Sequence, residues 1–207
     1  MIKLVEHANN KTRLTFTDQM RVRFKGLLDM IGGFFNRIGL MPNTMTILGL
    51  VGNTIGAVLL ARGYMTWGGL LILAMGPVDA LDGTMARLRG EPSEFGAFVD
   101  SVTDRYSELI IFGGLLYYYA QKGDWLGALV AFAAAGGSVL VSYVRARAQA
   151  LGYDTKVGIL TRMERYLVLA PSLVLGYPMI GLWIIAIFAN ITALQRIWDI
   201  RQKIHSQ

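Results

Sequence analysis

The chain contains no cysteine, so it forms no disulfide and offers no thiolate ligand to a metal ion. Its two histidines, His7 and His205, lie near the ends, which argues against a histidine-based metal site or a catalytic triad. Charged residues are also scarce: they make up 16% of the 207 residues, against about 25% in typical soluble domains. This scarcity of charge points to a membrane protein.

Hydrophobic residues make up 54% of the chain and gather in segments of the length that crosses a bilayer. The predicted spans are residues 43–61, 65–88, 94–120, 125–149, 157–176 and 178–200. The sequence therefore predicts an all-α integral membrane protein with six transmembrane helices, in one membrane domain over residues 38–207.

Basic residues lie mostly on one predicted side of the membrane. Seven precede the first span and five lie between positions 145 and 165, whereas the other side has only Arg62 and Lys122. By the positive-inside rule, both termini and the charged loops of this multi-pass protein face the cytoplasm, which favours the plasma membrane. Topology thus explains the net charge of +6, and no nucleic-acid partner is expected.

The segment ahead of the first span, residues 1–37, is predicted to be cytoplasmic. Residues 14–37 mix basic and apolar positions, which suits an amphipathic helix lying on anionic membrane lipids. The alternative is a poorly ordered leader.

Four aspartates interrupt the apolar pattern. Asp79 and Asp82 are three residues apart at the end of the second span, and Asp100 and Asp104 are four apart near the start of the third. Residues at these spacings share a helix face. Because four carboxylates repel one another, divalent cations are the expected partners, and all-oxygen ligands suit Mg²⁺ or Mn²⁺.

Other interpretations of the aspartates remain open at this point. They can pair with Arg87, Arg89 or Arg105, or line a cation path in a transporter. Gly83 and Gly96 are interpreted as positions where the two helices approach each other closely.

The spacing of the aspartates carries a resemblance to a known family. The pattern is Asp79–x2–Asp82–Gly83–x2–Ala86–Arg87, eight residues, Gly96–x3–Asp100–x3–Asp104. It resembles the complete signature of the CDP-alcohol phosphotransferases. The resemblance implies six membrane helices, two Mg²⁺ ions (Mn²⁺ is also suitable), and transfer of a phosphatidyl group from a CDP-linked lipid to an alcohol, with release of CMP.

The same resemblance implies roles for individual residues. Asp104 would be the base that takes the proton of the acceptor hydroxyl. The implied metal ligands are Asp79, Asp82, Asp100 and Asp104. The implied CDP-lipid contacts are Asn43, Thr46, Asp79, Asp82, Gly83, Arg87 and Ser93, with Gly83 admitting the cytidine and Arg87 holding the diphosphate.

A second region indicates the acceptor alcohol. The stretches "SYVRARA" and "GILTRMER", with "QR" in the last span, are similar to phosphatidylinositol phosphate synthases and their archaeal relatives. By this similarity Arg145, Arg165 and Arg196 would bind the phosphate of inositol 1-phosphate, whereas Arg147 cannot share a helix face with Arg145. The bacterial synthases usually have lysine in place of Arg145. The similarity also implies a CDP-diacylglycerol or CDP-archaeol donor and a homodimer.

Three other functions share some of these sequence features. The same reaction with glycerol 3-phosphate or free inositol is the nearest one. Intramembrane prenyl transfer also uses two aspartate-rich motifs, but typically with a longer chain and more spans. A non-catalytic transporter or scaffold is the third, and it would release no CMP.

Overall fold

The computed structural model describes residues 16–90, 93–155 and 157–206. Within these residues the chain forms seven α-helices and no strand. Their bounds are α1 (Phe16–Arg37), α2 (Pro42–Ala61), α3 (Met65–Arg89), α4 (Glu94–Gln121), α5 (Trp125–Ala150), α6 (Arg162–Val174) and α7 (Pro178–His205). The predicted all-α architecture is confirmed, while residues 1–15 of the predicted N-terminal segment lie outside the described residues.

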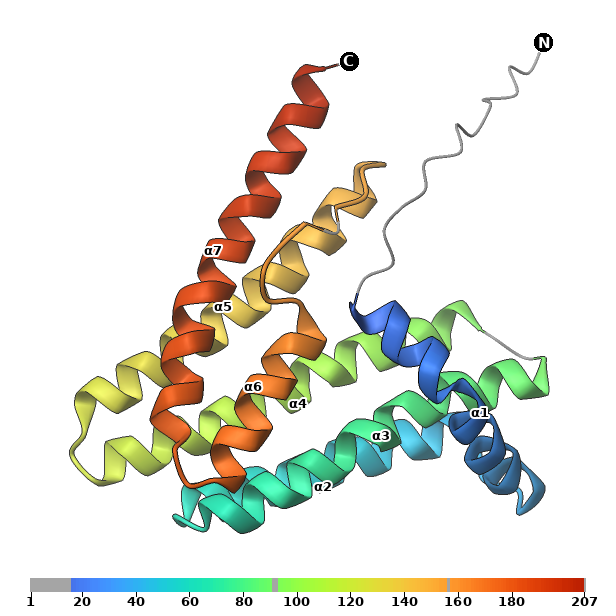
Figure 1. Ribbon diagram of the computed structural model, residues 1–207, viewed down its shortest axis with the longest axis horizontal. Helices are drawn as coiled ribbons and strands as arrows, with labels where there is room; N and C mark the ends of the chain where they lie inside the picture. The colour runs from blue at the N-terminus through green and yellow to red at the C-terminus, as the bar shows by residue number, and fades with distance from the viewer. Residues whose placement is uncertain (1–15, 91–92, 156, 207) are drawn as a thin grey trace.

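Three short links turn the chain back on itself between α2 and α3, α4 and α5, and α6 and α7 (Figure 1). Each contains a glycine of positive φ: Gly63 at 88°, Gly123 at 70° and Gly176 at 78°. Glycine suits this left-handed conformation because it has no Cβ to clash with the backbone. The gaps of one to four residues between the predicted spans at these three places therefore correspond to short links in the structure.

Within the described part of the chain, four helices are long and apolar enough to cross a membrane: α2, α3, α5 and α7. A helix rises about 1.5 Å per residue, so the 20 residues of α2 already match a hydrocarbon core about 30 Å thick. α4 has 28 residues but carries several charged side chains, and α6 has 13 residues, which is short for a crossing. The structure supports an all-α membrane protein with four clear spans.

The fifth predicted span, 157–176, is wrong at its start because α6 begins only at Arg162. The residues before it lie along α7 instead. The Leu160 N–H donates to Thr192 Oγ1 (3.0 Å), and the Val157 carbonyl accepts from Arg196 Nε (2.9 Å). These bonds to α7 use backbone groups that a continuing helix would have paired within itself.

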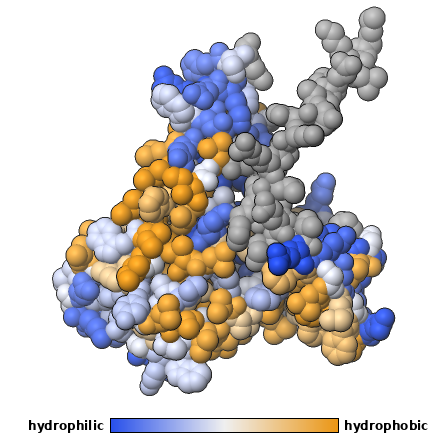
Figure 2. Space-filling view, viewed as in Figure 1, coloured by the Kyte–Doolittle hydropathy of each residue, from blue (hydrophilic) through white to orange (hydrophobic). Residues whose placement is uncertain are grey.

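The helical core is apolar and shared by several helices. α2 packs against both α3 and α4, and α5 packs against α7. The largest buried cluster includes Leu60, Phe112, Leu115, Leu173 and Ile185. On the outside, hydrophilic residues gather at the end of the molecule where α5 and α7 finish, above a surface rich in hydrophobic residues (Figure 2).

α1 is present at the place where the sequence predicts a helix, and it packs on α3. Leu28, Ile31 and Phe35 contact a small buried cluster of α2 and α3 residues. Other apolar side chains of α1 are exposed, among them Phe24, Leu27, Met30 and Phe34. A helix that packs on the protein with some apolar residues and exposes others fits a position at the edge of a membrane.

Arg89 of α3 links α1 to the rest of the molecule by hydrogen bonds. Its Nε donates to Asn36 Oδ1 (2.7 Å) and its Nη2 to the Leu40 carbonyl (2.6 Å), and Asn36 Nδ2 donates to the Met85 carbonyl (3.1 Å). Arg89 therefore holds the end of α1 and the link to α2 against α3.

Candidate functional site

The four aspartates come from two helices. Asp79 and Asp82 lie on α3, and Asp100 and Asp104 lie on α4. Asp82 and Asp104 are buried, with 7% and 8% of their surface exposed. Asp100 interacts electrostatically with each of the other three. The structure thus places the two motifs near each other, with carboxylates that repel.

The interpretation of two glycines as close contacts between α3 and α4 is wrong. A Cβ added to Gly83 would meet nothing within 4 Å, and one added to Gly96 would meet only Ser93 Oγ of its own helix start. α2 packs extensively against both helices, whereas α3 and α4 hardly pack against each other. Gly83 instead borders open space, beside the buried Asp82.

A cation from a third helix bridges the two motifs. Arg162, the first residue of α6, donates from Nη2 to Asp79 Oδ2 (3.0 Å). The same nitrogen makes a still shorter contact with Asp104 Oδ1. Arg162 therefore neutralises one carboxylate of each motif.

α2 positions the other side of the aspartate cluster. Thr46 Oγ1 donates to Asp82 Oδ2 (2.8 Å), and the Gly83 N–H donates to Asp82 Oδ1 (2.5 Å). Gly49 has no side chain where Asp79 approaches α2: a Cβ there would lie 2.5 Å from Asp79 Oδ1. Thr46, predicted as a nucleotide contact, thus bonds to a predicted metal ligand.

These residues suit a divalent metal ion by the chemistry of their donors. Carboxylate oxygens are the hard ligands that Mg²⁺ and Mn²⁺ prefer. In the described part of the chain, no three acidic or histidine side chains are gathered around one point as ligands. The contacts above give the reason: Asp79 and Asp104 turn to Arg162, while Asp82 turns to Thr46. The Arg162 guanidinium takes the place of a metal ion here, because this one cation contacts an aspartate of each motif.

The predicted CDP-lipid contacts lie at the same end of the molecule as the aspartates, because α2 begins where α3 ends. Asn43 is in the first turn of α2 and exposed. Arg87 is exposed near the end of α3 and donates from Nη2 to Thr84 Oγ1 (2.9 Å). Ser93 caps α4, since its Oγ accepts from the Gly96 N–H (2.9 Å). Ser93 thus has a clear structural role, while Asn43 and Arg87 are accessible to a ligand.

The three arginines predicted to bind the acceptor come from three helices and gather in space. Arg145 of α5 and Arg165 of α6 both interact electrostatically with Arg196 of α7. Arg165 and Arg196 are almost completely buried, with 2% and 3% of their surface exposed. Burying like charges together is unfavourable unless anions compensate them. The cluster is therefore suited to an anionic ligand.

Two of these arginines also connect helices and loops of the fold through hydrogen bonds. Arg165 pairs with Glu108 of α4 through Nε–Oε1 (2.8 Å) and Nη2–Oε2 (3.2 Å). Arg196 donates from Nε to the Val157 carbonyl and from Nη1 to the Val141 carbonyl (2.7 Å). Among the described residues, the buried Nε of Arg145 has no hydrogen-bond partner. Arg145 thus has a donor left for a ligand.

One face of α7 fixes the link between α5 and α6. Thr192 binds the Leu160 N–H, Arg196 binds the Val157 carbonyl, and Lys203 Nζ binds the Asp154 carbonyl (2.7 Å). The three α7 positions are spaced by four and seven residues, so they lie along one side of the helix. We call them the α7 stripe. The link runs antiparallel to α7 along this stripe.

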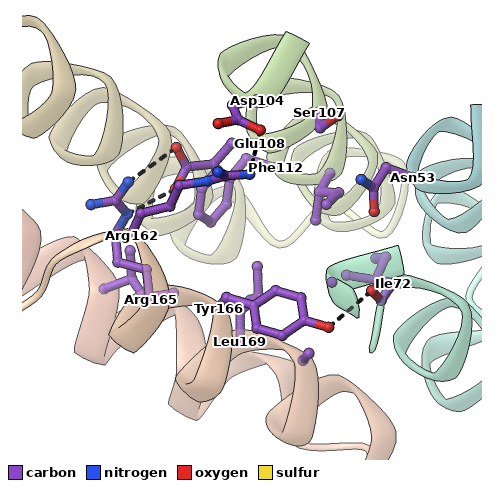
Figure 3. Close-up of a pocket in the computed structure, with 14 residues that line it drawn as sticks. Asn53, Ile72, Asp104, Ser107, Glu108, Phe112, Arg162, Arg165, Tyr166 and Leu169 are labelled. Atoms are coloured by element: carbon purple, nitrogen blue, oxygen red, sulfur yellow. Dashed lines mark hydrogen bonds and ion pairs between the residues drawn. The ribbon is translucent and has the colours of Figure 1, made fainter. Parts of the chain in front are cut away.

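A small cavity of about 70 Å³ is lined by residues of α2, α3, α4, α6 and α7 and reaches the aspartate cluster at Asp104. Its polar lining includes Asp104, Ser107, Glu108, Arg162 and Arg165. Figure 3 shows the two arginines pointing from α6 toward the α4 carboxylates. Two successive turns of α6 therefore face two successive turns of α4, one at the aspartates and one at the arginine cluster.

Tyr166 joins α6 to α3 in the same cavity. Its hydroxyl donates to the Leu73 carbonyl (2.6 Å), and the Ile72 carbonyl lies 3.3 Å away (Figure 3). In a regular helix the Leu73 carbonyl would accept from residue 77, but this residue is Pro77, which has no N–H. Gly76 makes room, because a Cβ there would collide with the tyrosine ring. The proline thus frees the carbonyl that Tyr166 binds.

Arg162, Glu108 and Gly49 were not assigned a role from the sequence. Glu108 follows Asp104 by four residues, so the spacing 100, 104, 108 places it on the aspartate face of α4. The Thr161 hydroxyl donates to the Glu164 carboxylate at the start of α6, three residues apart, although the Thr161 side chain caps no helix N–H group. These local signals were available, whereas nothing in the local pattern identifies Gly49 as the neighbour of Asp79.

Comparison with known proteins agrees with the site. The family model described as CDP-alcohol phosphatidyltransferase matches residues 39–195. A phosphatidylinositol phosphate synthase of Streptomyces avermitilis is 36% identical over 200 residues, covering 88% of this chain and 81% of the relative. An archaetidylinositol phosphate synthase of Pyrococcus horikoshii is 30% identical over 187 residues, covering 90% and 97%.

Solved structures are similar as well. The crystal structure of Mycobacterium tuberculosis phosphatidylinositol phosphate synthase with CDP-DAG bound matches with a TM-score of 0.78 and 30% identity, covering 84% of this chain and 92% of that one. A structure of the same enzyme in complex with manganese and citrate matches with a TM-score of 0.79, covering 84% and 88%. The family model and these relatives extend over most of the sequence, so this chain belongs to the CDP-alcohol phosphatidyltransferase family.

Proposed function

We propose that this enzyme transfers the phosphatidyl or archaetidyl group of a CDP-linked lipid to inositol 1-phosphate and releases CMP. The acceptor assignment rests on the arginine cluster formed by Arg145, Arg165 and Arg196, in which Arg165 and Arg196 are buried and Arg145 is half-buried. On α6 this cluster lies one turn from the aspartates. A phosphate held there would bring its hydroxyl-bearing ring toward Asp104. The relatives named as phosphatidylinositol and archaetidylinositol phosphate synthases support this choice.

In the proposed mechanism, the acceptor hydroxyl attacks the lipid-side phosphorus of the CDP-lipid. The new P–O bond forms as the bond from that phosphorus to the CMP oxygen breaks, and Asp104 takes the hydroxyl proton. Divalent ions, when bound by Asp79, Asp82, Asp100 and Asp104, supply charge stabilisation for the phosphate oxygens. Arg87 holds the diphosphate, and the open space at Gly83 admits the cytidine.

The protein's own groups position the reactants. Asp104 is a weak base, so most of its effect comes from holding the hydroxyl in line with the phosphorus. Thr46 orients Asp82 through its 2.8 Å bond, and Gly49 leaves room for Asp79. The arginine cluster fixes the acceptor by its phosphate, which selects phosphorylated over free inositol.

The proposed function also implies a membrane topology, a cellular location, a metal content and an oligomeric state. Six membrane crossings require α4 and α6 to pass the bilayer together with the four clear spans. Residues 1–37 form the cytoplasmic segment ahead of the membrane domain at 38–207, and the active site faces the cytoplasm from the plasma membrane. Two Mg²⁺ ions per active site and a homodimer follow from the family resemblance, and the manganese bound to the M. tuberculosis relative supports a divalent ion.

The decisive experiment measures CMP release from CDP-diacylglycerol and from CDP-archaeol. Inositol 1-phosphate, free inositol and glycerol 3-phosphate are compared as acceptors. We expect inositol 1-phosphate to give the highest kcat/KM, and activity to vanish with chelator and return with Mg²⁺ or Mn²⁺. A preference for free inositol would refute the acceptor, and full activity of both Asp100→Asn and Asp104→Asn would refute the metal site.

A further inference from the structure

Arg162 holds two of the four aspartates with one guanidinium. Its Nη2 bonds to Asp79 on α3 at 3.0 Å and to Asp104 on α4. Asp104 is only 8% exposed, so water competes weakly for this contact. We propose that Arg162 is the built-in counter-ion of the aspartate cluster and that a divalent ion binds by displacing it. This inference rests on the metal site of the proposed function.

The two cations exclude each other because they need the same oxygens. Mg²⁺ binds carboxylate oxygens at about 2.0–2.1 Å and keeps a nearly octahedral shell. A guanidinium nitrogen within hydrogen-bonding distance of Asp79 Oδ2 and Asp104 Oδ1 fills the space between these atoms. Its positive charge also repels a second cation there. Asp79 Oδ2 and Asp104 Oδ1 can therefore ligate an ion only after Arg162 has left.

Arg162 is placed so that it can leave without disturbing the helix that carries it. It is the first residue of α6, and its side chain is 49% exposed. The rest of α6 is held separately, by the Arg165–Glu108 pair and by the bond from Tyr166 to the Leu73 carbonyl. The side chain can turn toward water while the backbone of α6 stays on α3 and α4.

Removing Arg162 should change both the stability of the metal-free protein and its affinity for a divalent ion. Without Arg162, Asp79 and Asp104 lose their compensating charge, so the metal-free protein becomes less stable. The divalent ion no longer has to displace a competitor, so it binds more tightly. One charge-assisted hydrogen bond changes an equilibrium constant by roughly tenfold to a hundredfold, and we expect a gain in affinity of this size.

The test measures Mn²⁺ binding to the purified full-length protein in detergent, by the electron paramagnetic resonance signal of free Mn²⁺. Arg162→Met should bind Mn²⁺ roughly ten to a hundred times more tightly than the wild type. Arg105→Met is the matched control: Arg105 lies 3.9 Å from Asp104 Oδ2 with 37% of its side chain exposed, so its removal should change affinity little. Arg162→Lys should fall between Arg162→Met and the wild type.

Thermal unfolding provides a second readout. Arg162→Met should unfold at a lower temperature than the wild type without Mn²⁺, and Mn²⁺ should raise its unfolding temperature by more. Equal or weaker Mn²⁺ binding by Arg162→Met overturns the displacement while leaving the metal site intact. If the wild type binds no Mn²⁺, or binds it no better than Asp100→Asn, the metal site and the displacement are both overturned.

Discussion

Replacing Tyr166 with phenylalanine should destabilise the protein, because the packing of α6 on α3 uses a carbonyl that Pro77 leaves free. The substitution removes the hydroxyl that donates to the Leu73 carbonyl at 2.6 Å. Because Pro77 has no N–H, that carbonyl then lacks its usual helical donor in a largely apolar region. The bond lies on the exposed side of α3, where lipid or detergent chains surround the carbonyl and offer it no other donor. Leaving an acceptor unpaired there costs about 1–3 kcal/mol, and we expect Tyr166→Phe to lower the free energy of unfolding by this amount.

The proline can be used to test the cause. In Pro77→Ala the residue at position 77 has an N–H again, and it can donate to the Leu73 carbonyl within the helix. Tyr166→Phe should then cost much less in the Pro77→Ala background than in the wild type. The four proteins form a double-mutant cycle, measured as the free energy of unfolding in detergent micelles, with an expected coupling of about 1 kcal/mol or more. Tyr143→Phe, at a side chain that is 61% exposed, is the control for losing a tyrosine hydroxyl.

An equal cost of Tyr166→Phe in both backgrounds would refute this reasoning. It would mean that the hydroxyl stabilises α6 by something other than the carbonyl that Pro77 leaves free.

Three further predictions concern the ligands and the topology. Gly83→Ala should raise the KM for the CDP-lipid without lowering the unfolding temperature, because a Cβ there meets no protein atom within 4 Å; an unchanged KM would place the cytidine elsewhere. Arg145→Met should raise the KM for inositol 1-phosphate by roughly tenfold to a hundredfold, since one charge-assisted bond is lost, whereas the exposed Arg147→Met should change it little. Lys122→Cys and Leu151→Cys should be labelled from opposite sides of intact cells, and labelling from the same side would contradict the proposed orientation.

The sequence is a good guide to the parts of this fold that depend on local chemistry. Apolar length predicts the four clear spans, and the structure has a glycine of positive φ at 63, 123 and 176 in the short links next to them. Helical spacing places Asp79 with Asp82, and Asp100 with Asp104, on common faces. These features depend on residues a few positions apart, so a single sequence contains them.

Features that depend on residues far apart in the chain could not be predicted from the sequence. The late start of α6 follows from bonds between Leu160 and Thr192, 32 residues apart. The pairing of Glu108 with Arg165 spans 57 residues, and no spacing rule connects them. The predicted contact of α3 and α4 at their glycines was wrong for the same reason, because both helices pack mainly on α2 and local sequence does not reveal this.

The α7 stripe makes the length of one segment depend on another. Thr192, Arg196 and Lys203 bind the α5–α6 link at three successive points. The spacing of these residues along α7 therefore sets the register of the link. Inserting one residue into α7 between the first and last of these positions would turn everything beyond it by about 100° around the helix axis. The later contacts would then point away from the link. Length changes that preserve function are therefore expected beyond Lys203 or on the opposite side of the membrane, and not within this paired interval.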